Sequence, residues 1–263
     1  MTLLIDFLCR FGWGLSLALV LTPAALVPGG FFRVNLLVVM GLATFASLLA
    51  AGLPSASVLA GSQTAGVAGS VWLLTAVAAA AAWIGGILWL AGKEKGGSGA
   101  CALCTILLAA AVWGSGEPTP VAGGIRLLSG AVVGLTVHAM LLGHWYLNAP
   151  GMRVDALRQM IDLALVAWAL QLAAAGAMLA GANLAGATAG SPGLVGQPVG
   201  TTTLALASLR WLAGIVGLPV LLWMSRKTLE IPNTQSATGI LYVACLAAIV
   251  GELAAQLLAA SGR

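Results

Sequence analysis

The stretch from Arg126 to Asn148 reads RLLSGAVVGLTVHAMLLGHWYLN and is apolar over nearly its whole length. A helix needs about 20 mostly apolar residues to cross the hydrocarbon core of a bilayer, so this stretch predicts a transmembrane helix. Inside lipid every backbone amide must be paired within the protein, and a single apolar segment achieves this as a helix. The stretch also holds both histidines of the chain, His138 and His144. It therefore predicts a fold class and a first place to look for function.

Similar apolar runs fill the rest of the chain and are separated by Gly, Pro or charge clusters. The sequence is 60% hydrophobic and 7% charged, against about 25% charged residues in soluble domains. We therefore expect an all-α, polytopic membrane helix bundle in which residues 1–263 form a single transmembrane domain. The expected helices, about eight, cover residues 3–27, 36–53, 68–92, 100–114, 126–148, 155–182, 201–225 and 236–260. The short run 100–114 leaves a re-entrant segment open as an alternative.

The charges between the runs predict the orientation in the membrane. Four alternate loops are basic, with Arg33, with Lys93 and Lys95, with Arg153 and Arg158, and with Arg226 and Lys227. Cytoplasmic loops carry an excess of Lys and Arg, so we expect these loops in the cytoplasm, both termini outside, and the chain in a bacterial inner membrane. We expect the first run to be a retained helix rather than a cleaved signal peptide, since it carries charged residues.

Ionisable side chains within the runs should face the bundle interior and find partners, because each costs several kcal/mol in the bilayer. Asp6 and Arg10 lie one helical turn apart and are expected to pair. Arg210 and Glu252 lie on consecutive antiparallel helices, each roughly 12–15 Å from the outer end at 1.5 Å per residue. The sequence predicts an ion pair between them. Such a pair either locks the two helices together or takes part in handling protons or substrate.

A second polar group is expected near the cytoplasmic face. It comprises His144, Trp145, Tyr146, Gln159 and Asp162. A titratable imidazole, hydrogen-bonding side chains and an aromatic wall are what a quinone or quinol headgroup requires, and these residues form the predicted quinone-binding site. The alternative is that the two aromatic residues form an interfacial belt and the histidine only pairs with the aspartate.

The sequence does not predict a metal site. His138 and His144 point about 120° apart on one helix, so they cannot grip one metal, and this chain alone cannot supply bis-histidine haem ligation. Ligation by one histidine and one methionine stays formally open. Cys101 and Cys104 form a single C-x-x-C on the cytoplasmic side, where a stable disulfide is not expected. We interpret them as inert small residues first and as a redox pair second.

Three short segments in the last two helices resemble the C-terminal end of the membrane anchor subunits of DMSO-reductase-type enzymes. They are Ser208-Leu209-Arg210-Trp211, Leu221-Leu222-Trp223 and Ile249-Val250-Gly251-Glu252-Leu253. The resemblance covers about a fifth of the chain. Those anchors, like the related polysulfide-reductase type, are eight-helix bundles that exchange electrons with the quinone pool through an iron–sulfur partner. The resemblance implies a role for Arg210 and Glu252 alone, as an intramembrane polar pair. The chain also departs from those anchors, which place important polar groups in their early helices, because its second and third predicted helices have no ionisable residue.

The leading hypothesis is therefore a membrane subunit of a respiratory-type electron-transfer complex. It would anchor an iron–sulfur or cytochrome subunit and bind quinone, but no nucleic acid. The chain has no P-loop and no mid-membrane lysine, so we do not expect a self-contained enzyme. One alternative is a small proton-coupled transporter that uses His138, Asp162, Arg210 and Glu252 as relay groups. A purely structural membrane subunit is the other.

Overall fold

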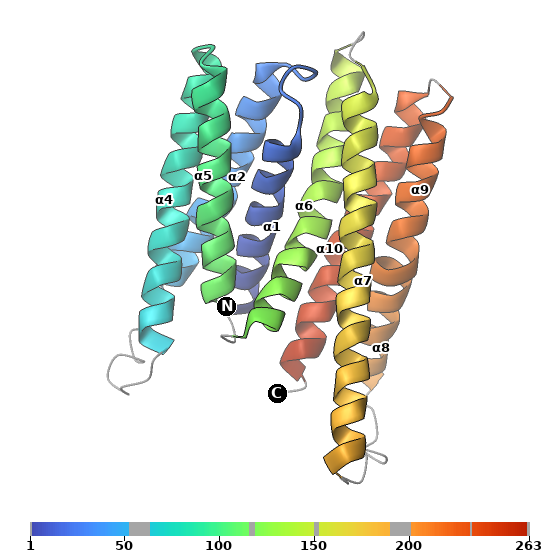
Figure 1. Ribbon diagram of the computed structural model, residues 1–263. Coiled ribbons are helices and arrows are strands. Elements are labelled where there is room, and N and C mark those ends of the chain that lie inside the picture. Colours follow the sequence, from blue (N-terminus) through green and yellow to red (C-terminus); the bar gives the residue numbers. More distant parts are fainter. Residues whose placement is uncertain are drawn as a thin grey trace.

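The computed structural model describes residues 2–52, 64–115, 119–149, 153–189, 201–231 and 233–261. Within these ranges the chain is helical and has no strand. The helices are α1 (Thr2–Leu21), α2 (Gly29–Ala51), α4 (Thr64–Leu90), α5 (Glu94–Gly114), α6 (Pro120–Asn148), α7 (Asp155–Ala189), α8 (Thr201–Leu209), the π-helix η1 (Arg210–Gly217), α9 (Leu218–Thr228) and α10 (Thr234–Ser261). They stand side by side in one bundle (Figure 1).

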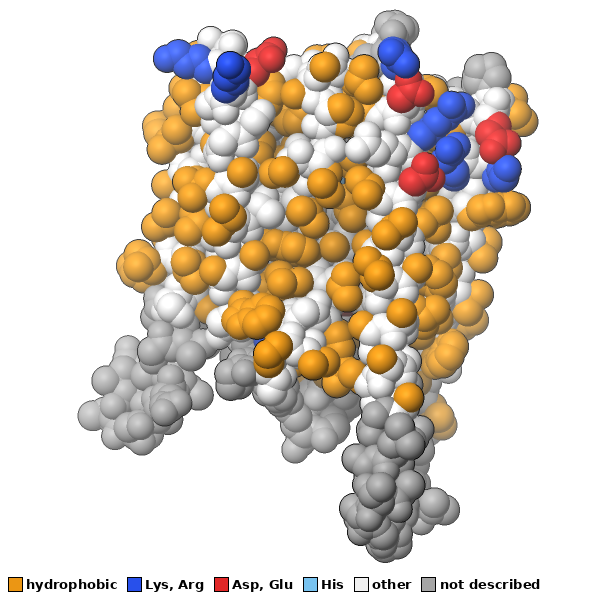
Figure 2. Space-filling view, viewed as in Figure 1, with side chains coloured by type: hydrophobic (Ala, Val, Ile, Leu, Met, Phe, Trp, Pro, Cys, Tyr) orange, Lys and Arg blue, Asp and Glu red, His pale blue; other side chains and the backbone are white. Residues whose placement is uncertain are grey.

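Eight segments of the described chain are long and apolar enough to cross a membrane, which confirms the expected all-α bundle. Helices α8, η1 and α9 follow one another without a break and make one of these spans, Thr201–Thr228. Large apolar side chains cover the outer surface of the bundle (Figure 2). Such a surface is suited to lipid rather than water.

The segment expected as a short helix at 100–114 is a full span in the structure. Helix α5 begins at Glu94 and packs along α4, so the re-entrant alternative is wrong. The sequence predicts a break between helices at the glycines before residue 100. Gly97 instead lies inside α5, where a Cβ would come within 2.5 Å of the Trp89 indole nitrogen. Glycine at this position permits close packing of two helices.

The two ends of the bundle differ in charge. Helix α1 begins and α10 ends at one end, which we call the terminal end (Figure 1). Lys and Arg side chains gather at the opposite end, which we call the basic end (Figure 2). Ion pairs there join Arg226 to Asp162 at 2.8 Å and Lys227 to Glu230 at 2.9 Å. The hydrogen bond from Lys227 lowers the pKa of the Glu230 carboxyl.

Helix α1 crosses α6 through glycines in close contact. A Cβ at Gly14 would lie within 2 Å of the Gly130 carbonyl oxygen, and one at Gly134 would lie 2.0 Å from the Gly14 carbonyl carbon. In lipid, where helices gain no hydrophobic energy by meeting, small residues allow the close backbone packing that holds them together. This crossing joins the first four spans to the last four, since α1 also packs on α2 and α5, and α6 on α7 and α10.

A proline explains the π-helix. In an α-helix the Pro219 ring would clash with the carbonyl four residues earlier, and the wider turn of η1 relieves that clash. The Leu218 N–H bonds to the Ala213 carbonyl, five residues back. The next such bond would run from residue 219 to Gly214, but proline has no N–H. The indole N–H of Trp168 on α7 donates to the Gly214 carbonyl at 3.2 Å and satisfies it.

Candidate functional site

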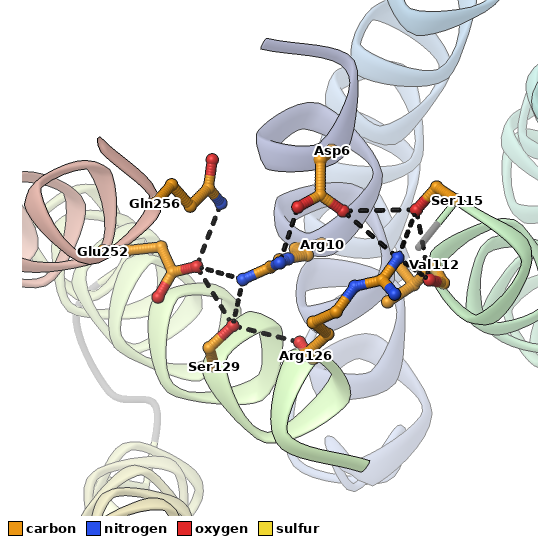
Figure 3. Close-up of polar contacts among 8 residues, drawn as sticks. All are labelled: Asp6, Arg10, Val112, Ser115, Arg126, Ser129, Glu252 and Gln256. Carbon is orange, nitrogen blue, oxygen red and sulfur yellow. Dashed lines mark hydrogen bonds and ion pairs between the residues drawn. The ribbon is translucent and has the colours of Figure 1, made fainter. Parts of the chain in front are cut away.

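A cluster of charged and polar side chains lies between four helices near the terminal end (Figure 3). We call it the polar network; it comprises Asp6, Arg10, Ser115, Arg126, Ser129, Glu252 and Gln256. Arg10 lies eight residues into α1 and Glu252 nine residues before the end of α10, so both lie roughly 12–14 Å from the helix ends at 1.5 Å per residue. The polar network therefore lies within the apolar spans, where each charge requires a partner.

Arg10 is the centre of the polar network. Its Nη2 lies 2.5 Å from Asp6 Oδ2 and its Nη1 lies 2.7 Å from Glu252 Oε1. The expected pairing of Asp6 with Arg10 is confirmed. The expected partner of Glu252 was wrong: the carboxylate pairs with Arg10 of the first helix, not with Arg210 of the neighbouring one. Counting residues from the helix ends gives the depth of Arg210 and Glu252 in the membrane. It does not give the direction in which a side chain points around its helix, and that direction decides its partner.

Glu252 makes all its contacts through one oxygen. Besides Arg10, Oε1 accepts a hydrogen bond from Gln256 Nε2 at 3.0 Å and lies 3.1 Å from the Ser129 hydroxyl. Oε2 makes no hydrogen bond with any residue of the described chain. The side chain is 5% exposed, so Glu252 is a buried carboxylate with one oxygen satisfied and the other available.

Arg126 joins the polar network to α5. Its Nη2 donates to the Val112 carbonyl at 2.6 Å and to the Ser115 hydroxyl at 2.7 Å, and it lies 3.6 Å from Asp6 Oδ1. A guanidinium at the C-terminus of a helix pairs with carbonyls that the helix leaves unbonded. The sequence predicts a helix that begins at Arg126 itself, which would put this side chain at the end of the bundle rather than inside it.

The sequence just before Arg126 contains a motif that marks the true start of this helix. Helix α6 begins at Pro120, with Thr119 as N-cap accepting a hydrogen bond from the Ala122 N–H at 3.3 Å. A threonine followed by proline is a common helix start, because proline lacks the N–H that would otherwise stay unpaired. The earlier start buries Arg126 in the bundle. Ser129 and Gln256 are not among the predicted site residues. In the sequence they differ from their neighbours only in being polar within apolar helices.

Two cavities flank the polar network. The terminal cavity, of about 190 Å³, opens among Thr2, Asp6, Arg10, Ser115 and Gln256 at the terminal end. The inner cavity, of about 60 Å³, lies between α6, α7, η1 and α10 and is lined by Ser129, Trp168, Gln171, Arg210, Glu252 and apolar side chains. A buried water needs roughly 10–15 Å³ measured this way and two to four polar partners. Both cavities meet these requirements, and Glu252 with its hydrogen-bond partners separates them.

Arg210 is the first residue of the π-helix. Its side chain and that of Glu252 both line the inner cavity. Within the described chain it makes neither an ion pair nor a hydrogen bond. The sequence thus identified two residues of one cavity but paired them wrongly. The close contact of η1 with α10 is backbone to backbone, since a Cβ at Gly251 would lie 2.7 Å from the Gly214 Cα.

The residues predicted to form a quinone pocket are not gathered in one place. His144 Nδ1 lies 3.1 Å from the Tyr242 hydroxyl, whereas Asp162 pairs with Arg226. The remaining three contact other partners: the Tyr146 hydroxyl donates to the Arg153 carbonyl, Gln159 donates to the Leu21 carbonyl at 3.5 Å, and Trp145 packs edge-on against Phe31 with ring centroids 5.7 Å apart. Neither of the two cavities includes any of these five side chains.

Tyr242, on α10, is the residue of this region that sequence reasoning missed. It is one of two tyrosines in the chain, and it lies eight residues into the last helix. His144 lies four residues before the end of α6 and Tyr242 eight residues after the start of α10, so both lie in the half of the bundle towards the basic end, which was the signal available in the sequence. Both side chains are exposed on the surface of the bundle.

His138 lies apart from the polar network. Its ring is fully buried, its Nε2 lies 2.7 Å from the Thr22 hydroxyl, and Phe31 packs edge-on with ring centroids 5.2 Å apart. In the described chain no hydrogen bond or ring contact joins it to Arg210 or Glu252. As a relay group it would therefore act separately from them.

The cysteines are free thiols buried among helices, and the Cys104 thiol lies 3.5 Å from the Ala78 carbonyl. Cys101 and Cys104 lie seven and ten residues into α5. Among the described residues, no three His, Cys, Asp or Glu side chains gather as metal ligands.

Comparison of the chain with protein-family models, curated proteins and solved structures finds no significant match.

Proposed function

We propose that the chain is a proton-coupled integral membrane protein in which Glu252 exchanges protons with the outside through the polar network. The observation that carries this proposal is the position of the polar network between two cavities. Asp6, Arg10 and Gln256 line the terminal cavity, and Glu252 lines the inner one. Carboxylates buried in transmembrane helices beside water-sized cavities are the usual parts of proton relays.

The chemistry assigns different roles to the charged side chains. Arginine stays protonated in proteins, so Arg10 cannot carry the proton itself and instead forms ion pairs with two carboxylates. Asp6 is reached from the terminal cavity, and no described residue forms a hydrogen bond with Glu252 Oε2 that would block it. A proton that neutralises Glu252 weakens its ion pair with Arg10, which then holds Asp6 alone. Protonation thus alters the contact between α1 and α10.

The proposed orientation follows from charge. The basic end faces the cytoplasm, because positively charged loops are retained there, and the terminal end faces the outside of a bacterial inner membrane. The polar network then takes protons from the side on which an energised bacterial membrane is more acidic. The purely structural alternative assigns the same ion pairs only to stability.

Glu252→Gln separates these alternatives. Glutamine keeps the size and the hydrogen bond to Gln256 but cannot exchange a proton, so we expect proton uptake into proteoliposomes under an imposed potassium diffusion potential to fall at least tenfold. The infrared absorption of protonated carboxyls that grows on acidification should also lose its component from a buried group, because Glu252 is buried whereas Asp155, Asp162 and Glu230 are exposed. Glu230→Gln, on the exposed basic end, is the matched control and should leave both signals unchanged. Two results would contradict the proposal. One is that both signals persist in Glu252→Gln, and the other is that the wild type shows neither signal.

A second candidate function is the quinone-binding membrane subunit of an electron-transfer complex, anchoring an iron–sulfur or cytochrome subunit. The observation that favours it is the exposed pair of His144 and Tyr242, with its hydrogen bond of 3.1 Å. A hydrogen-bonding pair on an apolar surface suits a lipid-soluble headgroup that approaches from the bilayer. In this form the site needs Tyr242 rather than Asp162.

For this candidate, His144→Ala should weaken binding of a short-chain ubiquinone to the reconstituted protein at least tenfold, measured by equilibrium dialysis. Tyr242→Phe should weaken it less, because the imidazole stays. Tyr146→Phe is the control, since the hydroxyl it removes contacts a backbone carbonyl away from the pair. Equal ubiquinone binding in His144→Ala and the wild type would remove the quinone site.

A further inference from the structure

We infer that the inner cavity binds a single carboxylate group attached to a short apolar tail, with Arg210 as its counter-ion. The inference deepens the proposed function by naming a substrate class. Its coupling to protons rests on that function, whereas the binding site rests on the cavity itself.

The first argument is the charge left over in this part of the membrane. The described residues of the polar network carry no net charge, because the carboxylates of Asp6 and Glu252 are matched by the guanidiniums of Arg10 and Arg126. Arg210 adds one positive charge beside it. The other carboxylates of the described chain lie at the basic end: Asp155, Asp162 and Glu230 form ion pairs there, and Glu94 begins α5 at the same end.

The depth of Arg210 makes that charge costly. It lies nine residues after Thr201, roughly 14 Å into the span at 1.5 Å per residue. An arginine at such depth is expected to pair with another charge or with a ligand, and intramembrane charges mark substrate pathways. A ligand carrying one negative charge would neutralise this region, whereas a dianion would add repulsion from Glu252.

The shape and lining of the inner cavity favour a carboxylate over a bare ion. The planar guanidinium matches a carboxylate with two parallel hydrogen bonds. The amide of Gln171 lines the same cavity and is a further donor. The other walls are apolar, including Val132, Leu172 and Leu218, and such walls hold methylene groups rather than a hydration shell.

The π-helix positions these groups. Pro219 forces the wide turn, and Arg210 lies at its first residue, facing α7 and α10 across the cavity. The Trp168 hydrogen bond to Gly214 and the contact of Gly214 with Gly251 hold the wide turn against both helices. π-turns within α-helices occur frequently at functional sites. Here the wide turn helps to form a cavity lined by Arg210, a cation without an ion-pair partner among the described residues.

Coupling follows from the two charges in the cavity. A carboxylate bound at Arg210 together with a proton on Glu252 Oε2 amounts to a neutral acid. Release of both to one side moves no net charge across the membrane. The proton is taken from water in the terminal cavity and returns to water, and no covalent bond is made or broken in the ligand.

The test measures carboxylate binding to the full chain in nanodiscs of phosphatidylcholine, with empty nanodiscs as background. The probes are octanoate, oleate, 1-octanol and chloride, and the readout is isothermal titration calorimetry together with tryptophan fluorescence. We expect octanoate to bind the wild type and to bind Arg210→Gln at least tenfold more weakly. Arg210→Lys should keep part of the affinity, because it retains the charge but loses the two-pronged geometry. Arg33→Gln, an exposed cation of α2, should bind as the wild type does.

The outcomes are distinct. Octanoate binding without oleate binding assigns a free short-chain ligand, and binding of both shows that a longer, membrane-derived tail is also accepted. Binding of oleate without octanoate would overturn the short tail. Equal octanoate binding in Arg210→Gln, octanol binding as tight as octanoate, or binding of chloride without either carboxylate would overturn the inference. If wild-type proton uptake occurs without octanoate binding, only this inference fails. If octanoate binding depends on Arg210 but proton uptake is absent, the proposed function fails and the site stands.

Discussion

Gly134→Ala is expected to destabilise the protein strongly although it adds a single methyl group. The new Cβ would lie 2.0 Å from the Gly14 carbonyl carbon and 2.4 Å from its Cα, and both are backbone atoms that no rotamer change can move. Overpacking in a core costs about 1–3 kcal/mol and occasionally more, and we expect at least the upper part of that range here. Unfolding of the reconstituted protein in mixed micelles, titrated with sodium dodecyl sulfate, measures the change.

The expected loss extends to function. Helix α1 carries Arg10, whose carbonyl lies against Gly130 at the same crossing. If the added methyl group forces α1 and α6 apart, Arg10 moves away from its partners Ser129 and Glu252. Gly124→Ala is the matched control, because it is in the same helix and has open space around its Cβ. Equal unfolding free energies for the two variants would contradict the role given to the crossing.

Arg10→Met is the second change expected to have a large effect. Methionine retains the approximate length of the side chain but removes the positive charge that Asp6 and Glu252 share. Removal of one partner from a buried ion pair costs about 3–5 kcal/mol, because the other charge stays buried without compensation. The same titration should show a loss of this size.

The double variant tests the physical reason. Glu252→Gln removes one of the two stranded carboxylates, so Arg10→Met combined with Glu252→Gln should recover part of the loss. Arg153→Met is the control, since its ion pair with Asp155 is exposed at 74% and 47% of the two side chains. Exposed pairs contribute about 0–1 kcal/mol. A double variant that is less stable than Arg10→Met alone would show that packing rather than charge holds this position.

The predicted fold held because hydropathy is a local property. Each span could be identified from its own residues. The predicted ends of two spans were wrong. Gly97 was taken as part of a loop and lies within α5. The predicted helix begins at Arg126, whereas α6 begins six residues earlier, at Pro120. These boundaries decide whether a charge lies in water or inside the bundle.

The candidate site could be predicted only where its members are close in sequence. Asp6 and Arg10 were expected to pair because four residues bring side chains to one face of a helix. The π-turn at Pro219 and the use of Trp168 to satisfy Gly214 were not predicted, since they depend on the neighbouring α7. Tyr242 was missed as the partner of His144 for the same reason.

The sequence by itself determined that the chain is a bundle of apolar helices, and it placed Arg210 and Glu252 at similar depth. Only the tertiary structure decided that Glu252 pairs with Arg10 and leaves Arg210 facing a cavity. Depth follows from 1.5 Å of rise per residue and can be counted along the chain. The rotation of each helix about its axis follows from which small residues meet across the bundle, here Gly14 with Gly134. That choice is made between helices distant in sequence, and it sets the partner of every buried charge.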